Sequence, residues 1–454
     1  MYNYKNKNIG ILGLGVTGRS AINFFSKYSN RIFVWDDLKK TRTDIVEKNI
    51  EFLDLNILKN LKLIDLLFIS PGIKPNHNII KLAKINNIAI VGDLDIFWHT
   101  KNKNKNRFIF ITGSNGKSTV TSLIHHLLIS AKKNSIIGGN IGVPVLSLNT
   151  NNKPNIYVIE ASSFQLNSIK KIKPDISILT NISADHIEWH GNYQSYINAK
   201  GNLFLNQDES DIAIINIDSE ECFKLYKRIN NRLIKPKIIK ISLKKKLKNT
   251  IYVDEGKVYD NINNENIFIG SIKDLSSLLG KHNIENIVIA IAAAIHEGVT
   301  HEQIRKFLPT FKGLSHRLEL IYKDSDLEFI NDSKSTNLVS CKVALNCFKN
   351  IIWIAGGIRK KDELSYLDDS ISSVKAAYFI GESAGEFVSY FRNSFYCKNA
   401  INIKYALIEA INYSKQLKGH STILFSPACA SYDQFKNYEE RGKIFVEEVN
   451  KYKN

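Results

Sequence analysis

The sequence predicts an α/β protein with parallel sheets, divided into three domains. Short apolar runs of the buried-strand type alternate with stretches of helical periodicity, which is the pattern of consecutive strand–helix–strand units. Two glycine-rich turns stand directly between a predicted strand and a predicted helix. The length of 454 residues corresponds to about three domains of ordinary size. We therefore expect domains at residues 1–100, 101–312 and 313–454.

The N-terminal domain is predicted from its apolar runs. These runs predict strands at residues 8–12, 31–35, 63–70 and 88–91. A stretch of helical periodicity covers residues 20–28 and follows the first glycine-rich turn. The polar Lys/Asn-rich stretch at residues 101–106 predicts the end of this domain.

The remaining two domains follow the same alternation. Strands of the central domain are predicted at residues 107–112, 156–160, 176–180 and 212–217. Helices are predicted from the second glycine-rich turn to about residue 131 and over 275–297. The Lys/Asn-rich residues 223–275 predict a small, mostly β insertion with no visible chemistry. After a boundary near Lys312 and Gly313, strands of the last domain are predicted at residues 327–330, 351–355, 377–380 and 422–425.

Composition excludes several classes of protein. The 62 Lys and Arg against 44 Asp and Glu give a net charge of +18, but the surplus is mostly Lys scattered among Asn and Ile, without interleaved aromatic residues. That pattern favours solvated faces over a nucleic-acid groove. The five cysteines form no CxxC pair, which fits a reducing compartment. No secretory signal and no run of about 18 apolar residues is visible, so we expect a cytoplasmic protein without a membrane span.

The first motif is the glycine-rich turn at residues 13–18. Its glycines permit a tight turn and a close approach of the backbone to phosphate, and the following helix offers free N–H groups. Asp36 lies about 20 residues further on, at a strand end, and completes a dinucleotide-binding fingerprint. The motif alone predicts a nicotinamide or flavin oxidoreductase, and a turn that only packs remains the alternative.

The second motif, Thr-Gly-Ser-Asn-Gly-Lys-Ser-Thr at residues 112–119, predicts a P-loop. Backbone N–H groups cradle phosphates, Lys117 reaches the β and γ oxygens, and the Ser118 hydroxyl can bind Mg²⁺. Ile111 stands where the full motif has its first glycine, so the match is to the shorter Gly-x-x-Gly-Lys-Ser form. The expected phosphate-binding residues are Gly113, Ser114, Asn115, Gly116, Lys117, Ser118 and Thr119.

Two further segments carry candidate metal-binding or catalytic residues close to this loop in the predicted fold. Glu160 ends an apolar strand and is a candidate Mg²⁺ ligand, because hard cations prefer oxygen; a carboxylate that stabilises a helix N-terminus is the alternative. Residues Asp185, His186, Glu188 and His190 crowd one turn after another predicted strand. A cluster of such residues next to a phosphate loop favours a functional role over a structural one.

These segments resemble the Mur ligase family. Its members are ATP-dependent amide-bond ligases of cell-wall peptide synthesis. The resemblance spans about residues 8 to 446 and includes Gly-Ser-Asn-Gly-Lys-Ser-Thr at 113–119, Asn-x-x-x-Asp-His at 181–186, Gly-Lys-His-Asn-Ile-Glu-Asn at 280–286 and Gly-Leu-Ser-His-Arg-Leu-Glu at 313–319. It implies a Rossmann-like N-terminal domain, a central P-loop ATPase-like domain and a C-terminal Rossmann-like α/β domain.

Two segments resemble the family member that adds D-glutamate. They are Asn-Asp-Ser-Lys-Ser-Thr-Asn at residues 331–337 and Ser-Pro-Ala-Cys-Ala-Ser-Tyr-Asp-Gln-Phe-Lys-Asn-Tyr-Glu-Glu-Arg-Gly at residues 426–442. The Asp-Asn-Pro-Arg segment of the relative that adds diaminopimelate or lysine is not found. The resemblance implies that ATP activates the alanyl carboxylate of a UDP-muramoyl substrate as an acyl phosphate, which the amine of D-glutamate then attacks in peptidoglycan precursor synthesis.

The resemblance changes the meaning of the first motif. In this family the N-terminal domain holds the UDP of the substrate and no redox cofactor. The residues that the resemblance assigns to the UDP-substrate are Val16, Thr17, Asp36, Asp37, Ser70 and Asn140. Leu38 departs from the polar or basic residue that close relatives often carry at this position.

The resemblance also implies roles in catalysis. Asn283, Asn286, Arg317 and Asp332 would contact ATP, in addition to the P-loop. Two Mg²⁺ sites are implied, with ligands Ser118, Glu160, His186 and Lys200. Lys200 matches the family's carbamylated lysine, which needs a desolvated, neutral amine to form. Lys117, His186 and Lys200 are the expected catalytic residues.

The D-glutamate site is implied in the last domain. The residues implied to contact D-glutamate are Lys334, Thr336, Lys360, Ser431 and Tyr438. The choice among Arg359, Lys360 and Lys361 stays open, and Lys436 and Arg441 are read alternatively as solvated charges.

The expected partners are the three small-molecule substrates of a monomeric enzyme, with no specific nucleic acid. A different Mur ligase, a folate polyglutamylating relative, a nicotinamide oxidoreductase and a nucleic-acid-binding module remain the alternatives.

Overall fold

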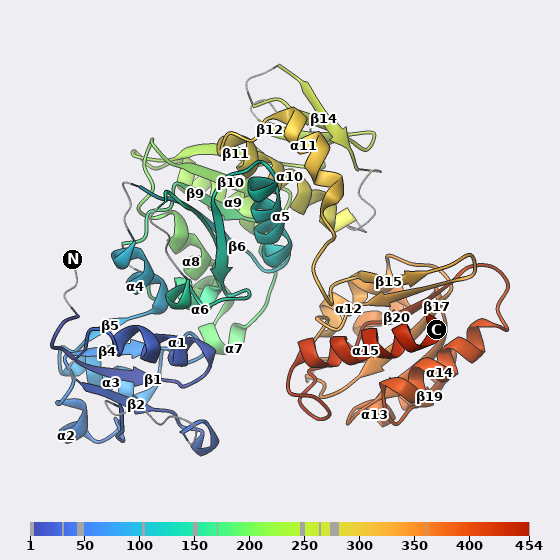
Figure 1. The fold of residues 1–454 in the computed structure, drawn as a ribbon, viewed down its shortest axis with the longest axis horizontal. Coiled ribbons are helices and arrows are strands. Elements are labelled where there is room, and N and C mark those ends of the chain that lie inside the picture. Colours follow the sequence, from blue (N-terminus) through green and yellow to red (C-terminus); the bar gives the residue numbers. More distant parts are fainter. Residues whose placement is uncertain are drawn as a thin grey trace. The chain divides into compact units, whose positions relative to one another are not determined.

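The structure is a computed structural model of the chain. It describes residues 4–29, 31–42, 50–101, 105–148, 153–169, 171–245, 250–262, 265–272, 281–360 and 362–453, apart from the side chains of residues 281, 282 and 453. The chain divides into two compact units, one of residues 1–274 and 285–309 and the other of residues 275–284 and 310–454. The described residues form an N-terminal and a central sheet in the first unit and a C-terminal sheet in the second (Figure 1).

The N-terminal sheet is parallel and has the strand order β3-β2-β1-β4-β5. Its strands are β1 (Asn8–Leu12), β2 (Arg31–Trp35), β3 (Ile50–Phe52), β4 (Leu66–Ile69) and β5 (Ala89–Val91). Its helices are α1 (Val16–Phe25), α2 (Leu58–Leu61), α3 (Asn78–Ile85) and α4 (Asp93–Thr100), with a 3₁₀ turn η1 (Lys39–Arg42). Separate apolar clusters pack on the two faces, so the sheet is buried on both sides. The strand order reverses between β1 and β4, where α/β folds bind their ligands.

The central sheet has the order β14-β13-β12-β11-β10-β9-β6-β8-β7. Its strands are β6 (Arg107–Thr112), β7 (Ser135–Gly139), β8 (Ile156–Glu160), β9 (Ile176–Leu179), β10 (Ile212–Asn216), β11 (Lys237–Ile241), β12 (Thr250–Asp254), β13 (Lys257–Asp260) and β14 (Ile267–Ser271). The strands from β7 to β12 pair in parallel, and β13 pairs antiparallel with both β12 and β14. The carboxyl ends of β6, β8 and β9 therefore share one edge of the sheet.

Helices cover the central sheet (Figure 1). They are α5 (Lys117–Ser130), α6 (Ser163–Leu166), α7 (Ile187–His190), α8 (Tyr193–Gly201), α9 (Glu220–Asn230), α10 (Lys281–His296) and α11 (His301–Phe307), with 3₁₀ turns η2 (Val145–Ser147), η3 (Asn202–Phe204) and η5 (Leu308–Thr310). One apolar cluster joins residues of α4, α6, α8 and α9, and α5 packs on β7 and β8. Because α4 also supplies this cluster, it links the N-terminal sheet to the central one.

The predicted insertion at residues 223–275 has a different structure. The first residues of this segment, 223–230, belong to helix α9. Its strands β11 to β14 extend the central sheet and do not form a separate module. The helix has a regular apolar face, since Cys222, Leu225 and Ile229 are buried at helical spacing. The abundance of Lys and Asn concealed this face in the sequence. Of the helix predicted over 275–297, the part before residue 281 lies outside the described residues.

The C-terminal sheet has the order β15-β16-β20-β17-β18-β19, with β15 antiparallel and the other pairs parallel. Its strands are β15 (Glu319–Lys323), β16 (Leu327–Asn331), β17 (Ile351–Gly356), β18 (Val374–Ile380), β19 (Tyr396–Asn399) and β20 (Ser421–Phe425). Its helices are α12 (Leu338–Leu345), α13 (Ala384–Phe391), α14 (Ile403–Ser414) and α15 (Tyr438–Lys453), with a 3₁₀ turn η6 (Leu364–Ser370). Helices α12 and α13 contribute to the apolar cluster on one face, and α14 and α15 to the other.

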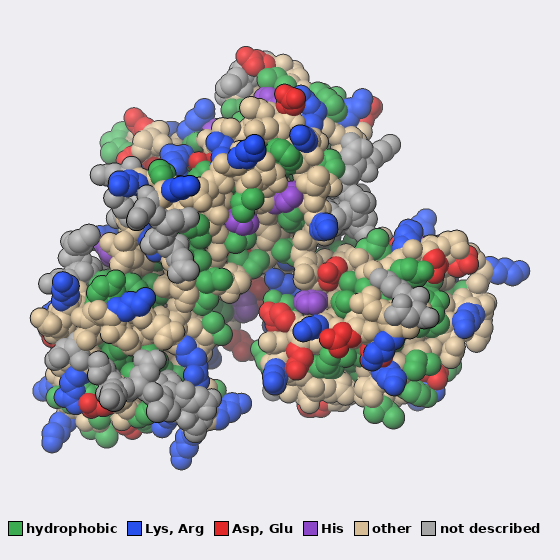
Figure 2. Space-filling view, viewed as in Figure 1, with side chains coloured by type: hydrophobic (Ala, Val, Ile, Leu, Met, Phe, Trp, Pro, Cys, Tyr) green, Lys and Arg blue, Asp and Glu red, His purple; other side chains and the backbone are tan. Residues whose placement is uncertain are grey.

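The surface bears on two of the expectations. On the face shown in Figure 2, Lys and Arg side chains are spread among acidic, polar and apolar ones, which is the distribution of solvated charges. Within the described residues, no helix combines the length and the apolar character needed to cross a bilayer.

Candidate functional site

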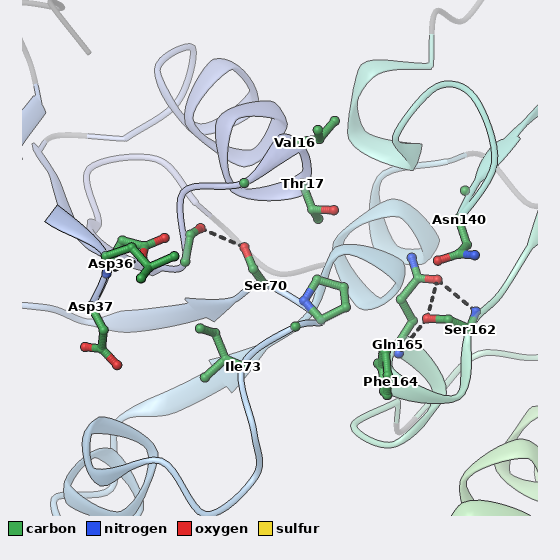
Figure 3. A pocket seen from close by; sticks show the side chains of 16 residues that line it. Val16, Thr17, Asp36, Asp37, Ser70, Ile73, Asn140, Ser162, Phe164 and Gln165 are labelled. Carbon is green, nitrogen blue, oxygen red and sulfur yellow. Dashed lines mark hydrogen bonds between the residues drawn. The ribbon is translucent and has the colours of Figure 1, made fainter. Parts of the chain in front are cut away.

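A cavity of about 490 Å³ opens at the carboxyl ends of β1, β2 and β4 (Figure 3). The six residues assigned to the UDP-substrate all line it: Val16, Thr17, Asp36, Asp37, Ser70 and Asn140. Figure 3 shows two walls, one from the N-terminal sheet and one from the central sheet. Ser162, Phe164 and Gln165 in the second wall were not predicted. Their sequence signal was the pattern Ser-x-x-Gln, a helix capping box, which is formed by Ser162 and Gln165.

The glycine-rich turn at residues 13–18 is shaped by close contacts. Gly13 has φ +90°, and a Cβ on Gly18 would lie 1.9 Å from the Gly13 carbonyl oxygen, so α1 starts directly on the turn. Ser70 Oγ donates to that carbonyl at 2.8 Å. Asp36 accepts from the backbone N–H of Leu14 at 2.7 Å and of Leu38 at 2.9 Å. Both oxygens of Asp36 thus hold the rim of the cavity in place.

Asp37 stands beside this rim with a second partner. His77 Nε2 lies 2.9 Å from its carboxylate, and this hydrogen bond is the main cause that lowers the pKa of Asp37. Asp37 therefore stays ionised at neutral pH. Val16 at the start of α1 is 73% exposed, so its side chain is open to a ligand.

The P-loop joins β6 to α5. Gly113 has φ +152° and Gly116 has φ +82°, and a Cβ on them would lie 1.9 Å from Thr180 Oγ1 and 2.1 Å from Asn286 Oδ1, respectively. Lys117 Nζ donates to the carbonyls of Gly113 and Ser114, both at 2.9 Å. The predicted contact residue Asn286 on α10 therefore lies against the loop, and the tight turn admits only glycine at both positions.

A second lysine reaches the same loop from α8. Lys200 is 1% exposed, and its Nζ donates to the Gly113 carbonyl at 2.7 Å, the oxygen that Lys117 also contacts. Its ammonium lies 4.5 Å from the centre of the Tyr196 ring. Burial, and then the charge of Lys117, hold the pKa of Lys200 well below its usual range. This environment favours a neutral amine.

Glu160 ends β8, which pairs with β6 so that Glu160 faces Ile111 in register. The side chain is 2% exposed, and its Oε1 accepts from Asn140 Nδ2 at 2.8 Å. Its Oε2 is buried and has no hydrogen-bond partner. An orphaned carboxylate oxygen is costly in a protein interior, and a cation would satisfy it.

Two of the metal ligands predicted from the sequence, Ser118 and Glu160, lie on neighbouring elements and could form an open cation site. Ser118 is buried at the first turn of α5, and the strand before that helix, β6, pairs with the strand that ends at Glu160. No group of three or more His, Cys, Asp and Glu that could enclose a metal occurs among the described residues. Mg²⁺ is usually held by one or two protein oxygens together with substrate phosphates, so a sparse oxygen set suits it.

The cluster of residues 185–190 divides into two environments. His186 is half exposed, has φ +54°, and lies 3.3 Å from Asp185 Oδ2. His190 is buried, and its Nε2 lies 3.0 Å from Ser163 Oγ. Burial, and then the charge of Lys200, lower the pKa of His190 to about 4, so that histidine stays neutral. Of the two histidines, His186 is the one accessible to a ligand.

Two contacts join the cavity to the P-loop edge within the first unit. Asn140, in the cavity wall, bonds to Glu160. Phe164, in the same wall, packs on His186 with ring centroids 4.8 Å apart. The predicted substrate pocket and the predicted phosphate site are therefore adjacent. This adjacency is what a transfer between two bound ligands needs.

The remaining residues predicted to contact ATP lie at the unit boundary and in the second unit. Asn283 is buried on α10, one turn before Asn286. Asp332 is buried and accepts from Ser426 Oγ at 2.8 Å and from the Leu318 N–H at 3.2 Å. Burial raises the pKa of Asp332 to about 7. Through Leu318 it fixes the backbone next to Arg317, which is half buried.

The structure brings some of the predicted D-glutamate residues together. Lys334 Nζ lies 5.7 Å from the centre of the Tyr438 ring. Thr336 is half buried, Ser431 is buried and Lys360 is exposed. Arg359 is paired with Glu386 at 2.8 Å, which leaves Lys360 as the available described cation of that loop. Lys361 lies outside the described residues.

The alternative reading of Arg441 as a solvated charge is wrong. Its side chain is fully buried, with bonds to Ser333 Oγ at 3.0 Å, the Cys429 carbonyl at 3.0 Å and the Ser333 carbonyl at 2.7 Å. Burial lowers the pKa of Arg441 to about 10. Arg441 thus connects α15 to the segments that carry the predicted amino-acid site. Lys436 is exposed, as that reading expects.

Comparison with known proteins identifies the family. Residues 111–294 match the Mur ligase middle domain, and residues 7–92 match the MurD-like N-terminal domain of Mur ligases. The chain is 36% identical over 453 residues to UDP-N-acetylmuramoylalanine–D-glutamate ligase from Rickettsia prowazekii, covering 98% of both chains. It is 34% identical to the enzyme of the same name from Caulobacter vibrioides, covering 98% of this chain and 96% of that one.

Solved structures agree on the fold. UDP-N-acetylmuramate–alanine ligase MurC from Thermotoga maritima matches with a TM-score of 0.59 at 16% identity, over 98% of this chain and 100% of that one. MurF ligase from Thermotoga maritima, solved in complex with ADP, matches with a TM-score of 0.56 at 13% identity, over 99% and 96% of the two chains. The identity of about a third over nearly the full length shows that this chain belongs to the Mur ligase family, in the branch of its MurD-type relatives.

Proposed function

We propose that this protein joins D-glutamate to UDP-N-acetylmuramoyl-L-alanine at the expense of ATP, in peptidoglycan precursor synthesis. The observation that carries the proposal is the contact between Asn140 of the cavity and Glu160 of the P-loop edge, at 2.8 Å. It sets a pocket fit for a nucleotide sugar beside a site fit for a nucleoside triphosphate. The names of the curated relatives, at 34–36% identity, describe this reaction.

The chemistry explains why both sites are needed. A carboxylate resists attack by an amine, because it is negatively charged and oxide is a poor leaving group. Phosphoryl transfer from ATP to the alanyl carboxylate forms an acyl phosphate and ADP. The amine of D-glutamate then adds to the carbonyl carbon, and the tetrahedral intermediate collapses to the amide with loss of phosphate. Positioning and charge neutralisation supply most of the catalysis in such a transfer.

The P-loop residues would hold the phosphates of ATP. The N–H groups of Ser114 and Asn115 donate to Asn181, so the backbone N–H groups at the start of α5 would bind phosphate, and Lys117 would leave its two carbonyl partners to reach the γ-phosphate. Asn286 would order the loop from α10 and, with Asn283, contact the nucleotide. Arg317 and Asp332 are the proposed ATP contacts of the second unit.

Mg²⁺ is the proposed metal, at two sites. Ser118 and Glu160 would hold one ion, and His186 with Lys200 the other. When bound, Mg²⁺ would neutralise charge on the transferring phosphoryl group. The orphaned Oε2 of Glu160 supports the first site. The exposed ring of His186, next to the cavity wall, supports the second.

Lys200 is proposed to carry a carbamate. Its Nζ is enclosed, contacts the Gly113 carbonyl and lies beside the cation of Lys117, and these surroundings favour the neutral amine that reacts with carbon dioxide. The carbamate would exchange a buried cation for an oxygen donor. Labelled bicarbonate, read by the NMR signal of a carbamate, tests this independently of turnover. Lys200→Met should lack that signal.

The second unit is proposed to bind D-glutamate. Lys334 and Lys360 supply cations for its two carboxylates, and Thr336, Ser431 and Tyr438 supply hydroxyl groups.

The three sheets support a division into domains at 1–100, 101–312 and 313–454. We also propose a monomeric chain that works in the cytoplasm, where its nucleotide substrates are found.

One assay tests the proposal. ADP formation is measured with UDP-N-acetylmuramoyl-L-alanine, with and without D-glutamate. We expect turnover only when UDP-N-acetylmuramoyl-L-alanine and D-glutamate are both present. We expect no comparable turnover when L-glutamate, L-alanine or diaminopimelate replaces D-glutamate. Equal turnover with diaminopimelate would assign the chain to a different Mur ligase reaction. No ADP with any of the amino acids would refute the proposal.

A further inference from the structure

Gln165 lies in a thin wall between two cavities. A second cavity of about 560 Å³ opens on the other side of the pocket described above. Ser70, Pro71, Ile73, Phe164 and Gln165 line both cavities. Gln165 is buried, and the oxygen and nitrogen ends of its amide have nearly the same shape, so packing alone does not decide which end points where. Hydrogen bonds must therefore set its orientation.

The hydrogen bonds of Gln165 run from one sheet to the other. Its Oε1 accepts from the backbone N–H of Ser162 at 3.0 Å and from Ser162 Oγ at 3.1 Å. Its Nε2 donates to Asp93 Oδ2 at 2.7 Å. Ser162 belongs to the central sheet side, whereas Asp93 starts α4 directly after β5 of the N-terminal sheet. The amide is thus held from both sides, by Ser162 in the wall of the first pocket and by Asp93, which lines the second cavity.

The carboxylate of Asp93 accepts its hydrogen bonds from groups of the protein itself. It is 2% exposed, and its Oδ1 accepts from the Leu94 N–H at 2.9 Å. Both oxygens of the carboxylate therefore face donors. Because Oδ2 can only accept from the amide nitrogen, it forbids the flipped orientation of Gln165, in which two oxygens would meet. The Ser162 N–H, which can only donate, and Asp93 Oδ2 together decide which end of the Gln165 amide faces which side.

We propose that Asp93 is a positioning residue for the UDP-sugar substrate, acting through Gln165. The clamp fixes the Gln165 nitrogen at the wall of the pocket, where its second N–H is directed to an acceptor oxygen on the sugar or its acyl chain. Asp93 itself does not touch the substrate. This inference rests on the proposed function, because it assigns the cavity at residues 13–18 to that substrate.

Kinetics of Asp93→Ala test the inference. Without this acceptor Gln165 Nε2 loses its partner on α4 and the amide is held only by the bonds from Ser162 to Oε1, so KM for UDP-N-acetylmuramoyl-L-alanine should rise about tenfold. The KM for ATP and kcat at saturating substrate should stay within about twofold, because nothing at the P-loop changes. If this variant does not fold, Asp93→Asn replaces it: Asn has one acceptor oxygen for the two donors, so the same increase in KM is expected.

A double variant separates positioning from general damage. Gln165→Ala alone should raise KM for the UDP-sugar, and adding the Asp93 change to it should raise KM no further. Asp175→Ala is the matched control. The carboxylate of Asp175 accepts from the Phe108 N–H at 2.8 Å, at the amino end of β6 and away from the P-loop. We expect the control to lower the melting temperature without changing KM.

The outcomes are distinct. An unchanged KM in the Asp93 variant, a further rise on the Gln165→Ala background, or an equal rise in Asp175→Ala would each overturn the inference. A wild-type chain that forms no ADP with the UDP-sugar would refute the proposed function instead, because its own turnover is measured before any variant is compared.

Discussion

The two glycine-rich turns of the first unit share a backbone design but differ in their charged side chains. Each follows a parallel strand, starts a helix and contains at least one glycine with positive φ at a position crowded by neighbouring atoms, namely Gly13 in the first turn and Gly113 and Gly116 in the second. Each also has an acidic residue at the end of an adjacent strand. At the first turn this is Asp36, and at the second it is Glu160.

The acidic residues show the difference. Both oxygens of Asp36 accept from backbone N–H groups, so this carboxylate shapes the rim of a pocket. Glu160 keeps one buried oxygen without a partner. Lys117 and Lys200 both contact the Gly113 carbonyl, whereas no lysine lines the pocket at the first turn in the described part of the chain. The same backbone design thus carries a carboxylate that only braces the turn in one place, and two lysines with a partly unsatisfied carboxylate in the other.

The largest expected effect is at the second turn. Lys117→Ala removes the cation proposed to neutralise the transferred phosphoryl group, and ADP formation should fall by about a thousandfold or more. Binding of the UDP-sugar, measured by calorimetry, should remain, because the first turn does not depend on this lysine. Phosphate release at the wild-type rate would contradict the assigned role of the loop.

Neutralising the two acidic residues one at a time sharpens the comparison. Glu160→Gln keeps the shape and the bond to Asn140 but removes the charge, so kcat should fall about a hundredfold and the Mg²⁺ concentration for half-maximal activity should rise. Asp36→Asn is the matched variant at the first turn, where the KM for the UDP-sugar should rise and kcat should not. Equal kinetic profiles of the two variants would show that the carboxylates have the same role.

The sequence predicted most interior strands and the edge strand β5, but it missed four other edge strands. The strands β3, β7, β15 and β19 were missed, and each lies at the edge of its sheet with a partly exposed burial pattern. An edge strand has solvent on one side and needs no apolar run, so it leaves a weak signal. Interior strands such as β6 and β8 are buried on both faces, and their predicted bounds match the structure.

The candidate site shows the same division. The motif residues at both turns were found because glycine, lysine and carboxylate at this fixed spacing are typical of phosphate-binding turns. Gln165 and Asp93 were missed because their roles depend on a contact between segments 72 residues apart. Arg441 was misread because a charged residue on an amphipathic helix normally faces water. Its burial depends on three acceptors from other segments, which no local pattern reveals.

A smaller effect concerns the geometry that both turns share. Gly18→Ala would place a Cβ 1.9 Å from the Gly13 carbonyl oxygen, so α1 must shift away from the turn. We expect a loss of about 1–3 kcal/mol in the free energy of unfolding and a weaker affinity for the UDP-sugar. Gly15→Ala is the control, since no atom lies within 4 Å of its added Cβ. Urea unfolding and calorimetry measure both effects, and equal destabilisation by the two variants would contradict the packing argument.

The smallest effect is the pH dependence of stability that comes from Lys200, the buried lysine on α8 that contacts the second turn. Burial and Lys117 lower the pKa of Lys200 in the native state, whereas the unfolded chain has the ordinary value of about 10.4. Between these two values the unfolded state binds more protons, so stability should rise with pH by up to about 1.4 kcal/mol per unit. Lys200→Met should remove this slope in urea unfolding in bicarbonate-free buffer and should stabilise the chain at neutral pH while abolishing turnover. The first turn, which lacks such a lysine, contributes no slope of this kind, so a slope that persists in Lys200→Met would have to arise from other groups.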